Sequence, residues 1–183
     1  MKPTSLLYAV RSCTTTMDTF QGKLSAKVSL NPALSHTGLS CARQLYLELG
    51  HRQLDTVYTS PCRRAYQTAQ ELARGPDTLI QFQNILRPWD WNPLEAADKA
   101  QQLKQWLHRI DLQHRCQRVV AITHHGMLQL LFHVICRQSL ESAQEMEFSR
   151  GSFAIFRAID GLWRLESLIT PEDLQRDQLA AAG

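Results

Sequence analysis

The chain alternates short apolar runs with segments of helical periodicity. Three apolar runs occupy residues 6–10 (LLYAV), 54–59 (LDTVYT) and 117–123 (QRVVAIT). Unbroken apolar runs of this length are typical of strands that are buried on both faces of a parallel sheet. Because helical segments separate them, the pattern predicts parallel strands that are joined by crossover helices.

Four helices are predicted between and after these strands. Three of them carry an apolar stripe at the spacing of an α-helix. The stripes are Ala42, Leu45, Tyr46 and Leu49; Leu103, Trp106, Leu107 and Ile110; and Met127, Leu130, Leu131 and Val134. The fourth helix lies in SPCRRAYQTAQELARG, with Ser60 as its N-cap, Pro61 at its first position and Gly75 just past its end. Ser35 or Thr37 is expected to cap the first helix, and each stripe is expected to face the sheet.

Two further strand-like runs flank Asp160 and Gly161. An Asp-Gly pair between two strands is typical of a tight hairpin turn, so we expect an antiparallel edge on the otherwise parallel sheet. After Pro171 the sequence becomes polar. We therefore predict one domain over residues 1–170 and a tail or short helix over residues 171–183.

The bulk composition narrows the class of protein. A length of 183 residues with 44% hydrophobic content suits one globular domain. The net charge of +3 comes from scattered lysines and arginines, so nucleic acid is not an expected partner. No apolar stretch approaches the roughly 20 residues that span a bilayer, and residues 6–10 are too few for a signal-peptide core. We therefore expect a cytoplasmic protein without a membrane partner.

The cysteines support the same compartment. They are Cys13, Cys41, Cys62, Cys116 and Cys136, an odd number without a CxxC pair. This spread is typical of reduced cytosolic thiols and not of a disulfide framework.

Three polar side chains follow the three apolar runs at the point where each strand is expected to end. Arg11 follows the first run, Arg64 or its neighbour Arg63 follows the second, and His124 or His125 follows the third. Parallel sheets bind ligands outside the carboxyl ends of their strands, so these groups are expected to meet in one crevice. Each residue alone would be an ordinary surface arginine or loop histidine. Together, the paired donors of two guanidiniums and an imidazole indicate a site for a phosphate-sized anion.

Three segments resemble the histidine phosphatase superfamily of phosphoglycerate mutase-like proteins. They are NPALSHTGLSCARQLYLEL, YTSPCRRAYQTAQELA and VVAITHHGMLQLL, which follow the same order in that superfamily. The resemblance implies an α/β three-layer sandwich, with a mostly parallel sheet of about six strands, an antiparallel edge and helices on both faces. It also implies that Arg11, Arg64 and His124 hold a phosphoryl group, which the superfamily transfers to a nucleophilic histidine.

The departures from the superfamily pattern fall on its catalytic and ligand-binding parts. Ser12 stands where the nucleophilic histidine is expected, and Cys13 replaces the adjoining glycine. Asp18 lies near the place of a phosphate-binding asparagine, where a carboxylate would repel the ligand. The segment 22–27 (GKLSAK) stands in for the superfamily's GRLQGR. The nucleophile is therefore predicted to be missing.

The general acid is also replaced. Pro88 occupies the position of the glutamate that serves as acid in one large branch, and the nearest carboxylates are Asp90 and Glu95. Asp90 is the candidate acid that we retain. The surrounding PWDWNP segment is expected either to form an apolar lid or to pack its two tryptophans on the core.

These departures predict a binder of a phosphorylated small molecule or phosphoprotein that does not turn its ligand over. A Ser12 hydroxyl would need an activating base such as His124, and it stops several bonds short of the reactive nitrogen of an imidazole. Two alternatives stay open: a weak phosphomonoesterase with a non-standard nucleophile, and a scaffold without phosphate binding. No cofactor is expected.

Two other chemistries are disfavoured. A cysteine phosphatase needs an arginine six residues after its cysteine, whereas Thr19 holds that position relative to Cys13. A metal site on His124 and His125 lacks a third ligand at a zinc-like spacing. The oligomeric state is not predicted.

Overall fold

One six-stranded sheet forms the centre of the molecule. The computed structural model describes residues 4–18, 31–50, 54–75, 78–174 and 176. The strands are β1 (Leu6–Arg11), β2 (Thr56–Thr59), β3 (Leu79–Phe82), β4 (Arg118–Thr123), β5 (Phe153–Ile159) and β6 (Leu162–Ile169), in the order β3-β2-β4-β1-β5-β6. The first four pair in parallel, whereas β5 runs antiparallel to both β1 and β6. This confirms the predicted sheet.

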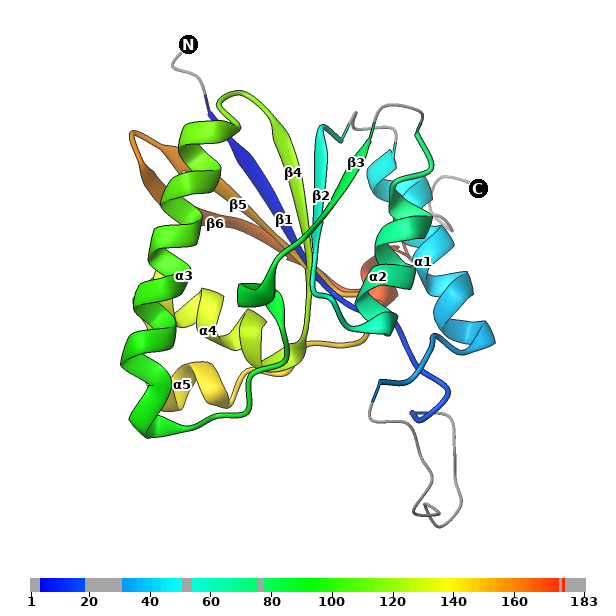
Figure 1. The fold of residues 1–183 in the computed structure, drawn as a ribbon, viewed down its shortest axis with the longest axis horizontal. Helices are drawn as coiled ribbons and strands as arrows, with labels where there is room; N and C mark the ends of the chain where they lie inside the picture. Colours follow the sequence, from blue (N-terminus) through cyan, green and yellow to red (C-terminus); the bar gives the residue numbers. More distant parts are fainter. Residues whose placement is uncertain (1–3, 19–30, 51–53, 76–77, 175, 177–183) are drawn as a thin grey trace.

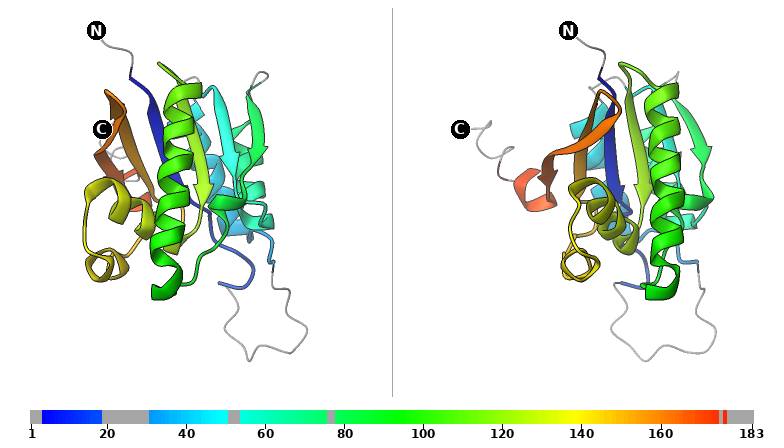
Figure 2. Two further views of the ribbon diagram at one scale, coloured as in Figure 1. Left: turned by 60° about the vertical axis from the view of Figure 1, so that its left-hand side comes forward. Right: turned by 90° about the vertical axis from the view of Figure 1, so that its left-hand side faces the viewer.

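Helices cover both faces of the sheet. The helices α1 (His36–Leu49) and α2 (Arg63–Leu72) lie on one side, and α3 (Pro93–Gln113), α4 (His125–Cys136) and the short α5 (Leu140–Gln144) lie on the other (Figure 1). The turned views show the same three layers (Figure 2). The predicted three-layer α/β architecture is therefore confirmed. Within the described part of the chain, no helix is both long and apolar enough to span a bilayer.

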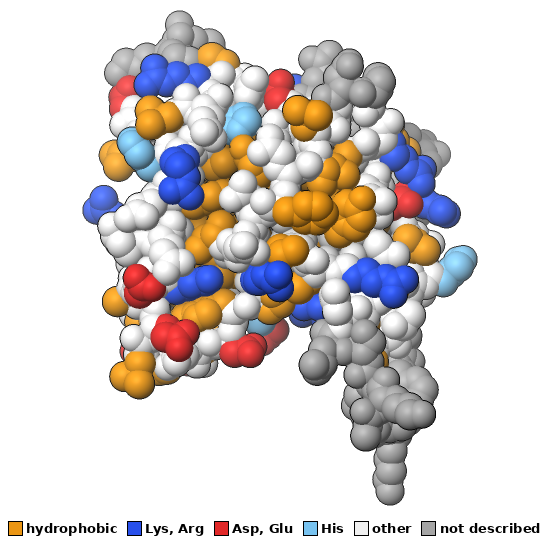
Figure 3. Space-filling view, in the orientation of Figure 1, with side chains coloured by type: hydrophobic (Ala, Val, Ile, Leu, Met, Phe, Trp, Pro, Cys, Tyr) orange, Lys and Arg blue, Asp and Glu red, His pale blue; other side chains and the backbone are white. Residues whose placement is uncertain are grey.

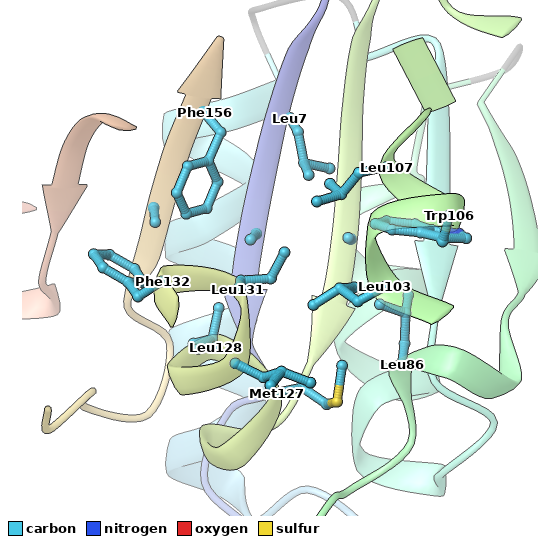
Figure 4. Packing of buried hydrophobic residues seen from close by; sticks show 14 of the residues in the cluster. Leu7, Leu86, Leu103, Trp106, Leu107, Met127, Leu128, Leu131, Phe132 and Phe156 are labelled. Carbon is cyan, nitrogen blue, oxygen red and sulfur yellow. The ribbon is translucent and has the colours of Figure 1, made fainter. Parts of the chain in front are cut away.

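The alternation of side chains along β1 divides the core into two clusters. Leu7 and Ala9 face the layer of α3 and α4, while Tyr8 and Val10 face the layer of α1 and α2. The first cluster includes buried side chains from both helices of its layer (Figure 4). Every residue of β2 and the last five of β4 are buried as well. The central strands are rich in apolar residues because neither of their faces meets water.

The predicted cap of the first helix and the predicted hairpin turn are confirmed, whereas the predicted ends of the second helix, with Pro61 as its first residue and Gly75 just past its last, are wrong, since α2 runs from Arg63 to Leu72. Ser35 caps α1, since its side chain accepts a hydrogen bond from the backbone N–H of Gly38. Asp160 and Gly161 form the predicted hairpin turn with positive φ values of 52° and 77°. The prediction that Ser60 caps the second helix is wrong, because α2 begins at Arg63 after Cys62. Ser60 lies too far ahead of the first turn, and its hydroxyl has another partner, described below.

Some elements were not predicted. β3 (LIQF) is a short strand at the edge of the sheet with three of its four residues exposed, and no strand was expected in this segment. Residues 171–174, in the segment for which a tail or short helix was expected, form a helical turn. The segment 22–27 and the end of the predicted tail lie outside the described residues.

Candidate functional site

Four of the five predicted site residues line one cavity of about 330 Å³ at the carboxyl ends of the parallel strands. Arg11 is the last residue of β1, Arg64 lies in the first turn of α2, and His124 directly follows β4. Asp90 comes from the loop before α3. The complete lining is Arg11, Arg64, Pro88, Trp89, Asp90, Trp91, His124, His125, Gly126, Gln129 and Arg150. In the space-filling view, basic side chains form a row at the level where the parallel strands end (Figure 3).

Arg11 is held by the backbone around it. Its N–H donates to the carbonyl of Ser152 over 2.9 Å, and its own carbonyl accepts from the N–H of Gly151 over 3.1 Å. Its guanidinium donates to the carbonyl of Phe148. Burial lowers the pKa of Arg11 to about 10, and the charge of Arg150 adds to this effect. The side chain is still a cation at neutral pH.

Arg64 presents a second cation to the cavity. Burial, followed by the charge of Arg150, lowers its pKa. Among the residues that the structure describes, no carboxylate forms an ion pair with Arg11 or Arg64. Both guanidiniums are therefore partly removed from water and have no anionic partner in the part of the chain that the structure describes.

Arg150 is a third cation at the site, and the sequence reasoning missed it. The predicted arginines and histidine of the site all lie at the carboxyl ends of strands. Because β5 runs antiparallel to β1, the amino end of β5 lies beside the carboxyl end of β1, with Phe153 opposite Val10. Arg150, just before β5, therefore reaches the same cavity. The RG pair ahead of a strand-like run was the only signal in the sequence.

The Arg150 guanidinium pairs with the carboxylate of Asp18 at 2.6 Å. The same carboxylate accepts hydrogen bonds from the N–H and the hydroxyl of Thr15, at 2.7 and 2.8 Å. Burial by itself would raise the pKa of Asp18, but these hydrogen bonds and the charge of Arg150 outweigh it and lower the pKa. The carboxylate that was expected to repel a ligand is therefore compensated by an arginine.

His124 is buried, with 5% of its surface exposed. Its Nε2 lies 2.9 Å from Oγ of Ser60, whereas its Nδ1 is buried without a partner among the described residues. Burial lowers the pKa of His124 to about 3, and the charges of Arg64, Arg150 and Arg11 contribute in the same direction. The imidazole is therefore neutral at physiological pH, and one of its nitrogens has an unused hydrogen-bonding capacity.

Ser12 is the predicted site residue that does not line the cavity. It is fully buried, and its Oγ has no hydrogen-bond partner among the described residues. Its backbone N–H donates to the carbonyl of Thr123 over 2.9 Å, which extends the pairing of β1 with β4. The Ser12 hydroxyl is therefore enclosed by the protein and is not part of the cavity lining.

The loop between β3 and α3 forms a wall of the cavity. Trp89 packs in the core with 8% of its surface exposed, and its ring lies 4.7 Å from that of Trp91, measured between centroids. Trp91 Nε1 donates to Oε1 of Gln129 on α4. A Cβ at Gly126 would overlap the carbonyl oxygen of Trp89, so α4 approaches this loop closely at that point. Both tryptophans therefore pack against the protein and line the cavity at the same time.

Comparison with known proteins assigns the family. A family model described as the histidine phosphatase superfamily (branch 1) matches residues 7–108. The chain belongs to this superfamily. The match includes Arg11 and Arg64 but ends before His124, whose place in the site comes from the geometry above. No curated protein sequence matches the chain significantly.

Solved structures share the superfamily fold at low identity. Phosphoserine phosphatase from Entamoeba histolytica, in complex with 3-phosphoglyceric acid, is 17% identical with a TM-score of 0.74, over 93% of this chain and 99% of that chain. A mycobacterial glucosyl-3-phosphoglycerate phosphatase is 17% identical with a TM-score of 0.72, over 91% and 99% of the two chains. YhfR from Bacillus stearothermophilus is 20% identical with a TM-score of 0.73, over 88% and 95%. These similarities establish the fold of this superfamily member.

The remaining features of this histidine phosphatase superfamily member add no second centre. His125 Nε2 lies 3.0 Å from Nε2 of Gln129 and 3.8 Å from the carboxylate of Glu147. No cluster of three or more potential metal ligands occurs among the described residues. Glu95 bonds Asn92 at 2.8 Å and does not line the cavity. A larger cavity of about 850 Å³ lies between α3, α4 and the β5–β6 hairpin, and it contains none of the predicted site residues.

Proposed function

We propose that this superfamily member binds a phosphorylated ligand in the 330 Å³ cavity and does not turn it over. The observation that carries the proposal is the separation of two functions that the superfamily combines. Arg11, Arg64 and Arg150 line the cavity, whereas Ser12, in the place of the nucleophile, is buried outside it. The site therefore has groups that hold a phosphate but no nucleophile that faces one.

The electrostatics of the cavity favour an anion. Burial lowers the pKa values of Arg11 and Arg64, and the repulsion of these two guanidiniums by that of Arg150 lowers them further. A bound phosphate would relieve this mutual repulsion and supply acceptors for the planar paired donors of arginine. His124 would add a neutral donor: when Nε2 accepts a hydrogen bond from the Ser60 hydroxyl, Nδ1 carries the ring hydrogen and can donate it to a phosphate oxygen.

The ligand class is a small phosphorylated molecule. A volume of about 330 Å³ is at the lower end of ligand cavities, which range from about 300 to 1,000 Å³. Trp89 and Trp91 provide an apolar wall for the part of the ligand beyond its phosphate. Binding of a phosphopeptide in place of a small phosphorylated molecule would overturn this assignment of the ligand class. Five free cysteines accord with the reducing cytoplasm as the place of action.

A weak phosphomonoesterase is the second candidate. The observation in its favour is that the Asp90 carboxylate lines the same cavity as the arginines. Cationic groups that stabilise the transition state can by themselves retain part of the rate enhancement when water attacks the phosphorus directly. Asp90 would then protonate the leaving group.

Turnover separates the two candidates. Hydrolysis of p-nitrophenyl phosphate is measured for the wild type and for Arg11→Ala, purified in parallel to exclude a contaminating phosphatase. We expect no turnover above that of the variant. Turnover that the wild type shows and Arg11→Ala lacks would overturn the non-catalytic assignment and support Asp90 as acid.

Binding is tested by titration with inorganic phosphate and with 3-phosphoglycerate. Arg11→Ala, Arg64→Ala and Arg150→Ala should each weaken affinity by about 1.5–3 kcal/mol, the strength of a hydrogen bond to a charged group. Arg109→Ala, on the exposed face of α3, is the matched control and should bind as the wild type does. Equal affinity in all five proteins would place phosphate binding outside this cavity, and no binding in any of them would leave a scaffold without a phosphate site.

A further inference from the structure

Two free cysteines that lie far apart in the sequence meet behind the anion cavity. Cys13 follows β1, and Cys41 lies in α1. The Cys13 thiol donates a hydrogen bond to Sγ of Cys41 over 3.1 Å. Cys13 is fully buried, whereas Cys41 is partly exposed. Neither side chain lines the cavity, so the proposed phosphate binding does not use them.

We propose that Cys13 and Cys41 are a redox-active pair, which forms a reversible disulfide and thereby lowers the affinity of the cavity for its ligand. A disulfide joins its sulfur atoms at about 2.0 Å, so closure needs the two sulfurs to approach by about 1 Å. The second part of the proposal, the effect on affinity, rests on the proposed function. The first part does not.

The environments of the two thiols differ in the way that a two-cysteine oxidation requires. Cys41 accepts the hydrogen bond from Cys13, which lowers the pKa of Cys41. The same bond, together with burial, raises the pKa of Cys13. Cys41 is thus the partly exposed thiol with the greater thiolate fraction, and Cys13 is the protected partner beside it.

A hydroperoxide completes the chemistry. The Cys41 thiolate attacks the O–O bond and takes a hydroxyl group to become a sulfenic acid; the alkoxide that leaves takes up the proton that the Cys41 thiol had lost and departs as an alcohol, or as water when the oxidant is hydrogen peroxide. The Cys13 sulfur then attacks the Cys41 sulfur and displaces hydroxide. This hydroxide takes up the proton that the Cys13 thiol gives up and leaves as water. Two thiols and one hydroperoxide therefore yield one disulfide, one alcohol and one water.

The backbone and two hydrogen bonds connect this pair with the arginines of the cavity. Cys13 lies two residues after Arg11, and its N–H donates to Oγ1 of Thr68 over 3.3 Å. The Thr68 hydroxyl in turn donates to the carbonyl of Arg64 over 2.9 Å. A displacement of Cys13 is therefore transmitted both to Arg11 and to the first turn of α2.

Gly151 connects the pair with the third arginine. It follows Arg150 directly, with a φ of 80°, and its N–H donates to the carbonyl of Arg11. A Cβ at this position would overlap Sγ of Cys41 and lie 3.7 Å from Sγ of Cys13. The backbone at Gly151, which bonds Arg11 and follows Arg150, thus packs directly on the two thiols. Since oxidation moves these sulfurs, it disturbs the arrangement of cations that the reduced protein holds ready for an anion.

The disulfide is tested by peptide mapping, which needs no ligand. The protein is treated with hydrogen peroxide, its remaining thiols are alkylated, and trypsin is added without reductant. Tryptic peptides 12–23 and 28–43 each contain a single cysteine of the pair. We expect them to appear as one linked species that lacks two hydrogen atoms and separates after reduction. Alkylation of both cysteines in the oxidised wild type would overturn the proposal whether or not any variant folds.

Two cysteine variants test which thiols form the disulfide. Cys41→Ser should abolish the linked species, and Cys116→Ser, which removes an exposed thiol, should leave it unchanged. A linked species that involves another cysteine in place of Cys41 would contradict the assignment.

The effect on the cavity is measured by titrating inorganic phosphate into the reduced and the oxidised protein. We expect oxidation to weaken binding by about fivefold or more, the lower range of coupling between sites, and we expect no change in Cys41→Ser. A linked species with unchanged affinity would overturn the coupling alone. Absence of phosphate binding in the reduced protein would overturn the proposed function and the coupling with it. The disulfide would still be established by the mass spectrum of the linked peptides.

Discussion

Nε2 of His124 lies 2.9 Å from Oγ of Ser60, which joins the loop after β4 to the loop after β2. The Ser60 oxygen also accepts from the N–H of Cys62 over 3.3 Å, just ahead of the helix that carries Arg64. A single hydroxyl thus positions the imidazole and braces the approach to α2. When the Ser60 hydroxyl donates a hydrogen bond to Nε2 of His124, the imidazole carries its hydrogen on Nδ1, the nitrogen that has no partner among the described residues.

Removal of this hydroxyl should affect both stability and binding. Ser60→Ala leaves a buried ring nitrogen without a partner, and we expect the free energy of unfolding to fall by about 1–3 kcal/mol. Phosphate affinity should fall as well, because the imidazole is no longer held. Urea unfolding and phosphate titration measure the two effects. Ser142→Ala, an exposed serine of α5, is the control, and equal stability of the two variants would contradict the role of Ser60.

The neutral state of His124 makes stability depend on pH. Its pKa is about 3 in the folded protein, against about 6.5 in an unfolded chain. Between these values the unfolded chain binds a proton that the folded protein does not. The free energy of unfolding should therefore fall as the pH is lowered from about 6.5 towards 3, by up to about 1.4 kcal/mol per pH unit, and this histidine has no effect above that range.

His124→Gln isolates the contribution of this side chain. Unfolding is compared between pH 6.5 and 5, above the range in which Asp18, with its lowered pKa, begins to titrate. His125, whose pKa is also lowered by burial and by Arg11, contributes in the same direction and is present in both proteins. The variant should show a shallower pH dependence than the wild type. Parallel curves would show that His124 is not held neutral in the folded protein.

Ser12→Ala should have little effect on binding. The Ser12 hydroxyl is buried, lies outside the cavity and has no partner among the described residues. We expect phosphate affinity to stay within about 0.5 kcal/mol of the wild type. Stability should be unchanged or higher, since the substitution removes a buried hydroxyl that lacks a hydrogen bond. A large loss of affinity in this variant would place Ser12 in the site after all.

Gly151→Ala tests the packing of the backbone on the two thiols. The backbone at Gly151 has a φ of 80°, and an added Cβ would overlap Sγ of Cys41. Gly161 has a φ of 77° with open space around it, so Gly161→Ala carries the backbone strain without the overlap. We expect a loss of about 1 kcal/mol for Gly161→Ala and a larger loss for Gly151→Ala. Thermal unfolding compares the two variants. Equal losses of stability would mean that the two thiols move aside at no measurable cost in free energy.

The sequence by itself determined the features that depend on local periodicity and on the direction of the strands. The central strands β1, β2 and β4 were predictable because burial on both faces demands unbroken apolar runs. The meeting of Arg11, Arg64 and His124 was predictable as well. Each follows a parallel strand, and the carboxyl ends of parallel strands lie together at one edge of the sheet.

Only the tertiary structure decided the features that arise between segments distant in the sequence. Arg150 reaches the cavity because β5 reverses direction, which brings the amino end of that strand to the site. Ser12 is enclosed by the packing around the end of β1 and does not line the cavity, and Ser60 bonds His124 because two loops converge. The contact of Cys13 with Cys41 likewise depends on how α1 packs against the loop after β1. Such contacts leave no periodic trace in the sequence, since they depend on the distances that packing sets between elements.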